Sequence, residues 1–191
     1  SIIFLFTFAF SVQSHIGHYS DFNYLEYELF RNDKSIGFHK YNFERKDNLL
    51  TIKSEVSFKI TKLGVDLYKY YAASEEEYKN NSFFRFSSKT NQNNKEKYVN
   101  IAFNSDENNL LIDGTSYKGV ASKDNIVGTW WNHEIIKAKG QISAISGRII
   151  EQKVTFIGKE KITINDKVYN TLHFNFKSSD ETLPDSKKLN T

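Results

Sequence analysis

Hydrophobic and polar residues alternate most regularly over residues 50–61. Polar side chains fill one parity, and five apolar residues, interrupted only by Ser54, fill the other: Leu50, Ile52, Val56, Phe58 and Ile60. A period of two is typical of a strand with one face in water and one face in a core. Wound as a helix, the same apolar residues would scatter around the circumference. The pattern therefore predicts a long strand that needs partners on both edges.

Similar alternation predicts strands on both sides of this segment. Residues 22–31 and 36–44 would form a hairpin, with a β-bulge near His39 and Lys40, where the apolar parity changes. Residues 63–79 fit either a helix or a long strand that turns at Asn80 and Asn81. The strand is favoured because the neighbours on both sides are strands and a lone helix would need a longer crossover. Further strands are expected at residues 82–89, 98–103, 110–112, 141–145, 148–157, 160–164 and 168–177.

The remaining segments lack this alternation. Residues 90–95 are predicted to be a polar turn and residues 119–128 a loop, and one short helix is expected near residues 131–138. About ten short strands favour an antiparallel meander, and a twisted sheet of that size tends to curl or close. We therefore predict an all-β fold, a large curved antiparallel meander forming an incomplete or closed barrel. It would be a single β domain over residues 22–179, followed by a polar tail over 180–191.

The beginning of the chain indicates export. Residues 1–10 are almost wholly apolar and uncharged, and small residues follow up to Ser14. This pattern predicts that residues 1–14 are the remnant of a signal peptide whose start is missing, cleaved near Ser14. A buried N-terminal strand is the alternative. The segment is shorter than the 20 or so apolar residues that span a bilayer, so no transmembrane span is expected.

Composition limits the range of expected cellular locations and binding partners. The chain has 191 residues and no cysteine, which excludes disulfides and a thiolate nucleophile. An exported protein without disulfides is more typical of the bacterial periplasm, so we predict a periplasmic location. The formal net charge is only +3 and the lysines do not cluster along the sequence, so nucleic-acid binding is not expected.

Several short motifs occur in a characteristic order. They are Tyr27-Glu28 with Ile36-Gly37, residues 63–68 followed by 75–78, and residues 129–132 followed by Gly147-Arg148 and residues 158–160. Over residues 24–179 this order resembles a family of exported bacterial β-proteins catalogued as a domain of unknown function. The resemblance implies an export signal and a large curved antiparallel sheet, and it supplies no established catalytic residues. The family pattern has a further strand pair after the position of Leu189, so this sequence is expected to stop before a final hairpin.

The densest cluster of reactive side chains is Trp130-Trp131-Asn132-His133-Glu134. Tandem tryptophans could stack on a sugar ring or form the floor of a lipid cavity, and His133 beside Glu134 could act as an acid or base. Alternatively, one tryptophan plugs the end of the barrel while the other packs on its rim. The pair is not a zinc-protease motif, because Lys137 stands where a second histidine is needed.

The sequence gives little indication of a metal site or of a known catalytic or phosphate-binding motif. His39, His133 and His173 could in principle converge on a metal, but nothing in the sequence brings them together, and three ordinary surface or rim histidines are expected. No calcium loop, nucleophile elbow or phosphate-binding glycine loop occurs. We therefore predict no metal and no cofactor.

These observations favour a non-enzymatic protein that holds an apolar or lipid-like ligand in its curved sheet. The candidate ligand-binding residues are Trp130, Trp131, His133, Tyr68 and Tyr70. One alternative is an envelope assembly or scaffold protein that pairs with an envelope protein partner through exposed strand edges. A hydrolase centred on His133 and Glu134 is a further alternative.

Overall fold

The alternating segment forms strand β3 (Leu49–Lys62), which lies inside an eight-stranded antiparallel sheet. The computed structural model describes residues 21–164 and 166–191, and in it the eight strands follow one another in chain order. The other seven are β1 (Tyr24–Arg31), β2 (Lys34–Lys46), β4 (Val65–Lys79), β5 (Ser82–Gln92), β6 (Lys95–Asn104), β7 (Asn109–Gly114) and β8 (Lys118–Ser122). The export signal expected over residues 1–14 lies outside the described residues.

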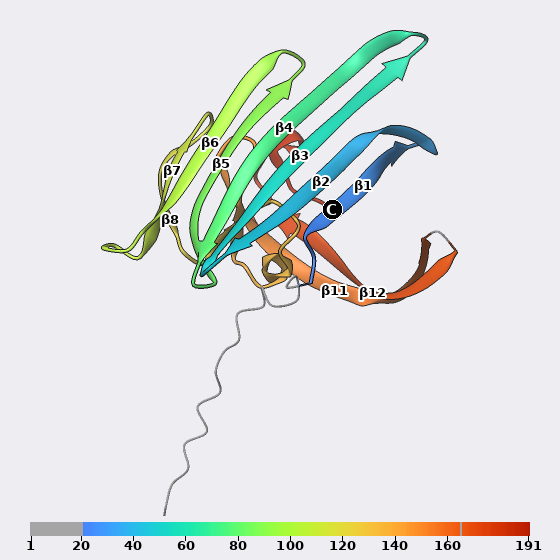
Figure 1. Ribbon diagram of the computed structural model, residues 1–191. Coiled ribbons are helices and arrows are strands. Elements are labelled where there is room, and N and C mark those ends of the chain that lie inside the picture. Colours follow the sequence, from blue (N-terminus) through green and yellow to red (C-terminus); the bar gives the residue numbers. More distant parts are fainter. Residues whose placement is uncertain (1–20, 165) are drawn as a thin grey trace, which may run out of the picture.

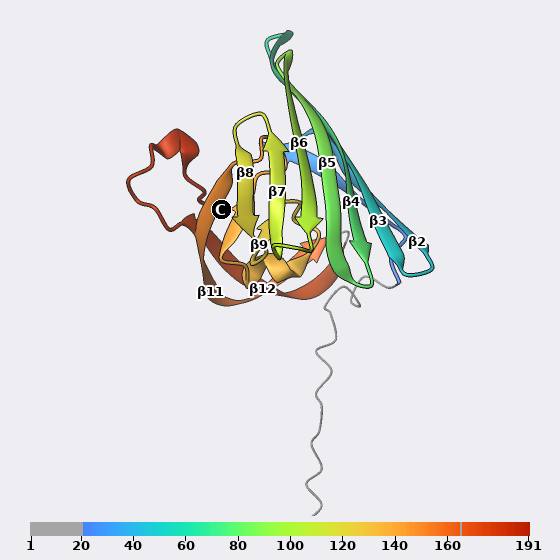
Figure 2. The same ribbon diagram turned by 90° about the vertical axis from the view of Figure 1, so that its left-hand side faces the viewer.

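A second sheet of four strands has the order β12-β11-β10-β9. Its strands are β9 (Asn125–Val127), β10 (Gly140–Ile142), β11 (Ile149–Ile164) and β12 (Lys167–Ser178). The large sheet is a curved, open layer, and the small sheet lies across one end of it (Figures 1 and 2). In the described part of the chain, β1 pairs only with β2 and β8 only with β7. The predicted all-β curved meander is confirmed, and it is incomplete rather than closed.

Two-residue turns set the register of the long hairpins. Four of these turns have both residues at positive φ: Asn32 and Asp33 (50° and 58°), Leu63 and Gly64 (52° and 78°), Asn80 and Asn81 (52° and 63°), and Asn93 and Asn94 (49° and 64°). This geometry matches the twist of the flanking strands, and asparagine and aspartate tolerate it. The polar pairs seen in the sequence therefore become tight reversals that keep the hairpins in register.

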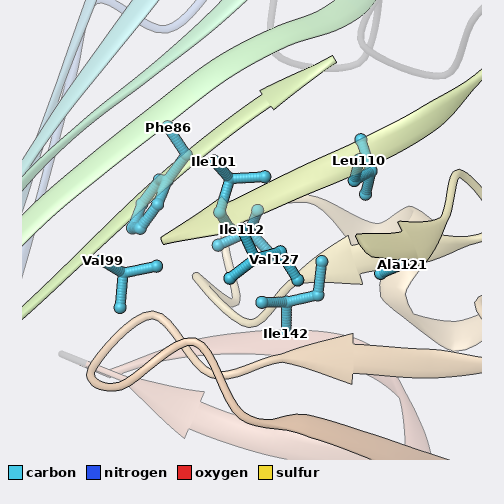
Figure 3. Close-up of a cluster of buried hydrophobic side chains, with 8 residues drawn as sticks. All are labelled: Phe86, Val99, Ile101, Leu110, Ile112, Ala121, Val127 and Ile142. Carbon is cyan, nitrogen blue, oxygen red and sulfur yellow. The ribbon is translucent and has the colours of Figure 1, made fainter. Parts of the chain in front are cut away.

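Two apolar clusters join the layers. The first combines residues of β5–β8 with Val127 of β9 and Ile142 of β10, so it holds the small sheet against the large one (Figure 3). The second combines residues of β2–β4 with Trp131, which comes from the segment after β9. Both clusters lie on the face of the large sheet that carries the apolar parity of β3, as its alternation predicts.

Four local predictions are wrong. The segments 148–157 and 160–164, expected as separate strands, both belong to the single strand β11. The bulge in β2 lies at Ile36, where the register slips between Leu29 and Phe30 of β1, and β2 pairs regularly with β3 past His39. The parity change has another cause, since Phe38 simply lies on the outer face. Residues 119–128 contain β8 and β9 rather than a loop, because strands this short bury too few side chains to show alternation. The turn predicted over 90–95 is only two residues long, since β5 and β6 extend into it.

The expected helix near residues 131–138 is a single 3-10 turn, η2 (His133–Ile136). The side chain of Asn132 caps it by accepting a hydrogen bond from the Glu134 backbone N–H, at 3.0 Å. Ile135 of this turn is buried, and Ile136 is partly buried. The polar tail contains a short 3-10 turn, η3 (Asp185–Lys187), and returns to β12, where Thr191 and Phe176 exchange two backbone hydrogen bonds.

Candidate functional site

The two adjacent tryptophans point in different directions. Trp130 has a left-handed backbone (φ 65°) and is 47% exposed, with its ring edge-on to Phe176 at 5.3 Å. Trp131 is 4% exposed and packs edge-on against Phe43 and Tyr78, each at 5.7 Å between ring centroids. Because the rings separate, they do not form a joint stacking platform. Trp131 is therefore part of the packed interior, and Trp130 lies at the surface.

The other predicted ligand residues lie elsewhere. Tyr68 and Tyr70 stack on Phe58, at 5.8 and 5.0 Å, in the half of β4 that leads away from Trp131. His133 opens η2, is one-third exposed, and lies 3.7 Å from the Glu134 carboxylate. The structure therefore brings Trp131 and His133 into one neighbourhood but leaves the two tyrosines at the far end of β4.

A fully buried carboxylate lies beside Trp131. Glu76 is 2% exposed and accepts three hydrogen bonds: from Tyr78 OH at 2.6 Å, Trp131 Nε1 at 2.8 Å and Thr129 Oγ1 at 2.9 Å. Burial raises the pKa of Glu76 above its ordinary value, and the three donors act in the opposite direction. Glu76 thus ties β4 to the segment that carries both tryptophans.

This polar network continues in two directions. Asn132 Nδ2 donates to Tyr78 OH at 3.3 Å, so a second residue of the tryptophan segment is joined to β4. On the other side, Tyr41 OH donates to the backbone oxygen of Thr129 at 2.7 Å. Since each contact joins residues far apart in sequence, the network fixes how the tryptophan segment lies on the large sheet.

His39 extends the network along β2. Its ring lies 4.2 Å from the ring of Tyr41, and its Nε2 contacts Ser54 Oγ at 2.9 Å. Burial lowers the pKa of His39 to about 4, so the side chain is neutral in the folded protein near neutral pH. His39 therefore contributes packing and hydrogen bonding rather than positive charge.

We expect this histidine to make stability depend on pH. Between pH of about 6.5 and 4 the unfolded chain binds a proton at His39 that the folded chain does not bind, so the free energy of unfolding should fall as pH decreases. Urea unfolding of the wild-type protein and of His39→Gln at pH 7 and pH 5 checks this, because the variant lacks the effect. His173→Gln is the matched control. An equal loss in the wild type and in His39→Gln would contradict the prediction.

The three histidines do not converge. His39 lies in β2, His133 opens η2, and His173 contacts the Glu160 carboxylate on the β11–β12 hairpin. Within residues 21–164 and 166–191, no group of three or more histidine, cysteine or carboxylate side chains is placed to hold a metal ion. The same residues contain no helix long and apolar enough to cross a membrane.

A cleft of about 730 Å³ opens beside this network, between the turns that end β4, β6 and β8 and the segment around η2. Its apolar lining consists of Tyr78, Phe83, Phe103, Leu110, Ile126, Val127 and Ala138. Its charged lining consists of Lys123, Asp124, Glu134, Lys137 and Lys139. Tyr78 belongs both to the cleft wall and to the Glu76 network, so the buried carboxylate holds part of the wall in place.

Sequence reasoning missed the central residue of this site. A run of three glutamates is usually a solvated face, yet only Glu75 of the run Glu75-Glu76-Glu77 is substantially exposed. The sequence contained one signal, since Glu76 shares its parity with Tyr78. In the structure this parity faces the core, where Glu76 pairs across the sheet with Ile52 and Phe86. A glutamate on the apolar parity of a strand needs buried donors, and those donors come from a distant segment.

Comparisons with known proteins identify the family but no characterised relative. No curated protein and no solved structure matches the chain. A family model described as "Domain of unknown function (DUF6134)" matches residues 27–190, which covers most of the chain and both sheets. The resemblance to a domain of unknown function, inferred from the sequence motifs, is thereby confirmed. The chain belongs to the DUF6134 family.

Proposed function

We propose that the protein is a non-enzymatic binding protein for an apolar, lipid-like ligand with an acidic head group, held in the cleft beside Glu76. The observation that carries this proposal is the composition of the cleft. Its buried apolar lining residues, Tyr78, Leu110 and Val127, form the floor, and its exposed lining residues, Lys123, Lys137 and Lys139 among them, form the rim. Its volume of about 730 Å³ falls in the range usual for small-molecule sites. An apolar floor favours a hydrocarbon chain because binding removes both surfaces from water.

The rim favours an anionic head group. Lys137 lies 3.1 Å from Glu134 and Lys139 lies 3.4 Å from Asp124, so these two charges are partly balanced by neighbours. Lys123 adds a third positive charge, which leaves the rim with an excess of cations. Exposed lysine can follow a flexible carboxylate or phosphate group as a mobile point charge. The rim therefore selects for acidic amphiphiles over neutral ones.

We place this activity in the periplasm on the strength of the sequence. The apolar residues 1–10 and the small residues that follow support export, and the absence of cysteine suits that compartment. We assign no catalytic role to the network. Glu76 lies behind the cleft wall, where three protein donors already occupy its oxygens.

Filling the cleft should abolish binding. We expect Ala138→Trp, which places an indole ring among the lining residues, to weaken binding of a dansyl-labelled fatty acid by at least about tenfold, equivalent to about 1.4 kcal/mol. Ala102→Trp is the matched control because Ala102 is exposed on β6 outside the cleft. Dansyl fluorescence measures both affinities. The methyl ester of the same fatty acid should bind more weakly than the acid.

Two results would overturn the proposal. Equal affinities of Ala138→Trp and Ala102→Trp would show that the probe binds elsewhere. Native mass spectrometry of protein purified from its own compartment provides the second check, because a bound ligand adds a discrete mass that is lost on denaturation. A bare chain mass from several growth conditions, together with no dansyl binding, would favour the envelope scaffold instead.

A further inference from the structure

The β3–β4 hairpin ends in exposed apolar side chains. Leu63, in the two-residue turn, is 95% exposed, and Val65 and Leu67, within the first three residues of β4, are 61% and 55% exposed. The β3–β4 and β5–β6 hairpins reach farther out than β7 and β8, so their tips stand clear of the body of the protein (Figures 1 and 2). These side chains are thus presented to the surroundings rather than to a core.

The turn itself is unusual for this chain. Leu63 has a φ of 52°, the left-handed conformation that the turns β1–β2, β4–β5 and β5–β6 give to asparagine or aspartate. The left-handed conformation is unfavourable for a residue with a Cβ, and asparagine and aspartate offset part of this cost with local hydrogen bonds that leucine cannot make. A fully exposed leucine recovers nothing by burial. Leu63 therefore contributes no stability to the fold as described.

Positive charge surrounds the same tips. Five lysines stand against two carboxylates in residues 59–69 and 92–97: Lys59, Lys62, Lys69, Lys95 and Lys97 against Asp66 and Glu96. The excess of three equals the formal net charge of the whole chain, +3, so the remainder is neutral. The β5–β6 turn is fastened to β4, since Asn93 and Lys69 exchange two hydrogen bonds, at 2.9 and 2.7 Å. The two tips consequently form one cationic end of the molecule.

We propose that this end docks on a lipid bilayer that contains anionic lipids, with Leu63 inserted at the level of the head groups. Val65 and Leu67 would follow Leu63 into the interface, and the surrounding lysines would contact lipid phosphates. Apolar side chains flanked by lysine suit this boundary, because the chain ends enter the acyl region while the ammonium groups stay in water. Each lysine near an anionic surface adds to the electrostatic attraction between the protein and the bilayer.

A bilayer fits the shape of this end better than a protein partner does. A stable protein interface buries about 800 Å² on each side, and it needs a broad complementary surface. A two-stranded hairpin end offers a narrow convex surface with three apolar side chains. Membrane association needs no matching surface, since lipids pack around whatever enters. Docking at these tips is independent of the proposed ligand, whose cleft lies at the opposite ends of β4 and β6.

The absence of cysteine allows a direct test. Leu63→Cys, labelled with the environment-sensitive dye NBD, should shift to the blue and brighten on vesicles of phosphatidylcholine with phosphatidylglycerol. It should change little on phosphatidylcholine alone, and salt should reverse the effect. Leu111→Cys, labelled in the same way on β7, is the matched control because Leu111 is 44% exposed away from the tips. Equal responses at the two positions would overturn the proposal. They would mean that the protein binds vesicles through another part of the chain, such as the apolar residues 1–10, which both variants share.

A second variant separates docking from folding. Leu63→Asn creates an Asn-Gly turn, which favours the positive φ values that residues 63 and 64 already adopt. Thermal stability should therefore be maintained or raised. Its affinity for the anionic vesicles should fall about tenfold, as expected when one leucine no longer leaves water. Unchanged affinity would contradict insertion of the tip. A blue shift of the Leu63 label that appears without vesicles and grows with protein concentration would also overturn the proposal, in favour of a protein contact.

Discussion

Glu76→Ala is expected to destabilise the protein by about 4 kcal/mol, because the change leaves buried donors without an acceptor and opens a cavity. The hydroxyl of Tyr78, the indole N–H of Trp131 and the hydroxyl of Thr129 would all lose their partner. Glu75→Ala is the matched control: its side chain is 40% exposed and lies 3.9 Å from Arg85, so its loss should cost less than about 1 kcal/mol. Urea unfolding measures both. Similar losses in the two variants would show that Glu76 does not hold the tryptophan segment.

Glu76→Gln refines the same prediction. The amide keeps the volume, and its oxygen can accept from Trp131 and Thr129, so the loss should be far smaller than for alanine. The pH dependence has a definite sign. Burial raises the pKa of Glu76 above 4.5, so the unfolded chain ionises first and the wild type loses stability as pH rises through the folded value. The glutamine variant lacks this loss, so its free energy of unfolding should rise relative to that of the wild type as pH increases.

Gly37→Ala is expected to destabilise the protein by about 3 kcal/mol, because strands β2 and β3 approach too closely for a side chain. A Cβ at Gly37 would lie 2.0 Å from the backbone oxygen of Ser57 and 2.6 Å from the Cα of Phe58. Both are backbone atoms of the paired strand, so no side-chain rotation relieves the clash. The strands would have to separate next to the bulge at Ile36. Thermal and urea unfolding measure the loss.

Gly158→Ala is the matched control for Gly37→Ala. Gly158 also lies in a strand next to a bulge, but no atom lies within 4 Å of its added Cβ. The substitution should therefore change the free energy of unfolding by no more than about 0.5 kcal/mol. If both glycines tolerate alanine equally, the close approach of β2 and β3 does not constrain the fold.

The alternation along the chain was sufficient to predict β3, whereas β4 was predicted from its strand neighbours and β11 was predicted as two shorter strands. In β3 the apolar side chains lie on one parity, and this periodicity can be read without knowing the partner strand. Asparagine pairs predicted the tight turns for an equally local reason, since their side chains tolerate positive φ. The short strands β8 and β9 escaped prediction because their pairing depends on neighbours rather than on their own pattern.

The candidate site depended on contacts that no local pattern contains. Glu76 is buried because β3 and β5 place Ile52 and Phe86 beside it, and because Trp131, 55 residues later in the chain, brings a donor to it. The same long-range packing separated the two tryptophans and left Tyr68 and Tyr70 at the far end of β4. The sequence by itself determined an all-β meander with tight asparagine turns, because those preferences act between neighbouring residues. Only the tertiary structure decided which carboxylate is buried and where the cleft opens, because both depend on register and on segments that meet across the sheet.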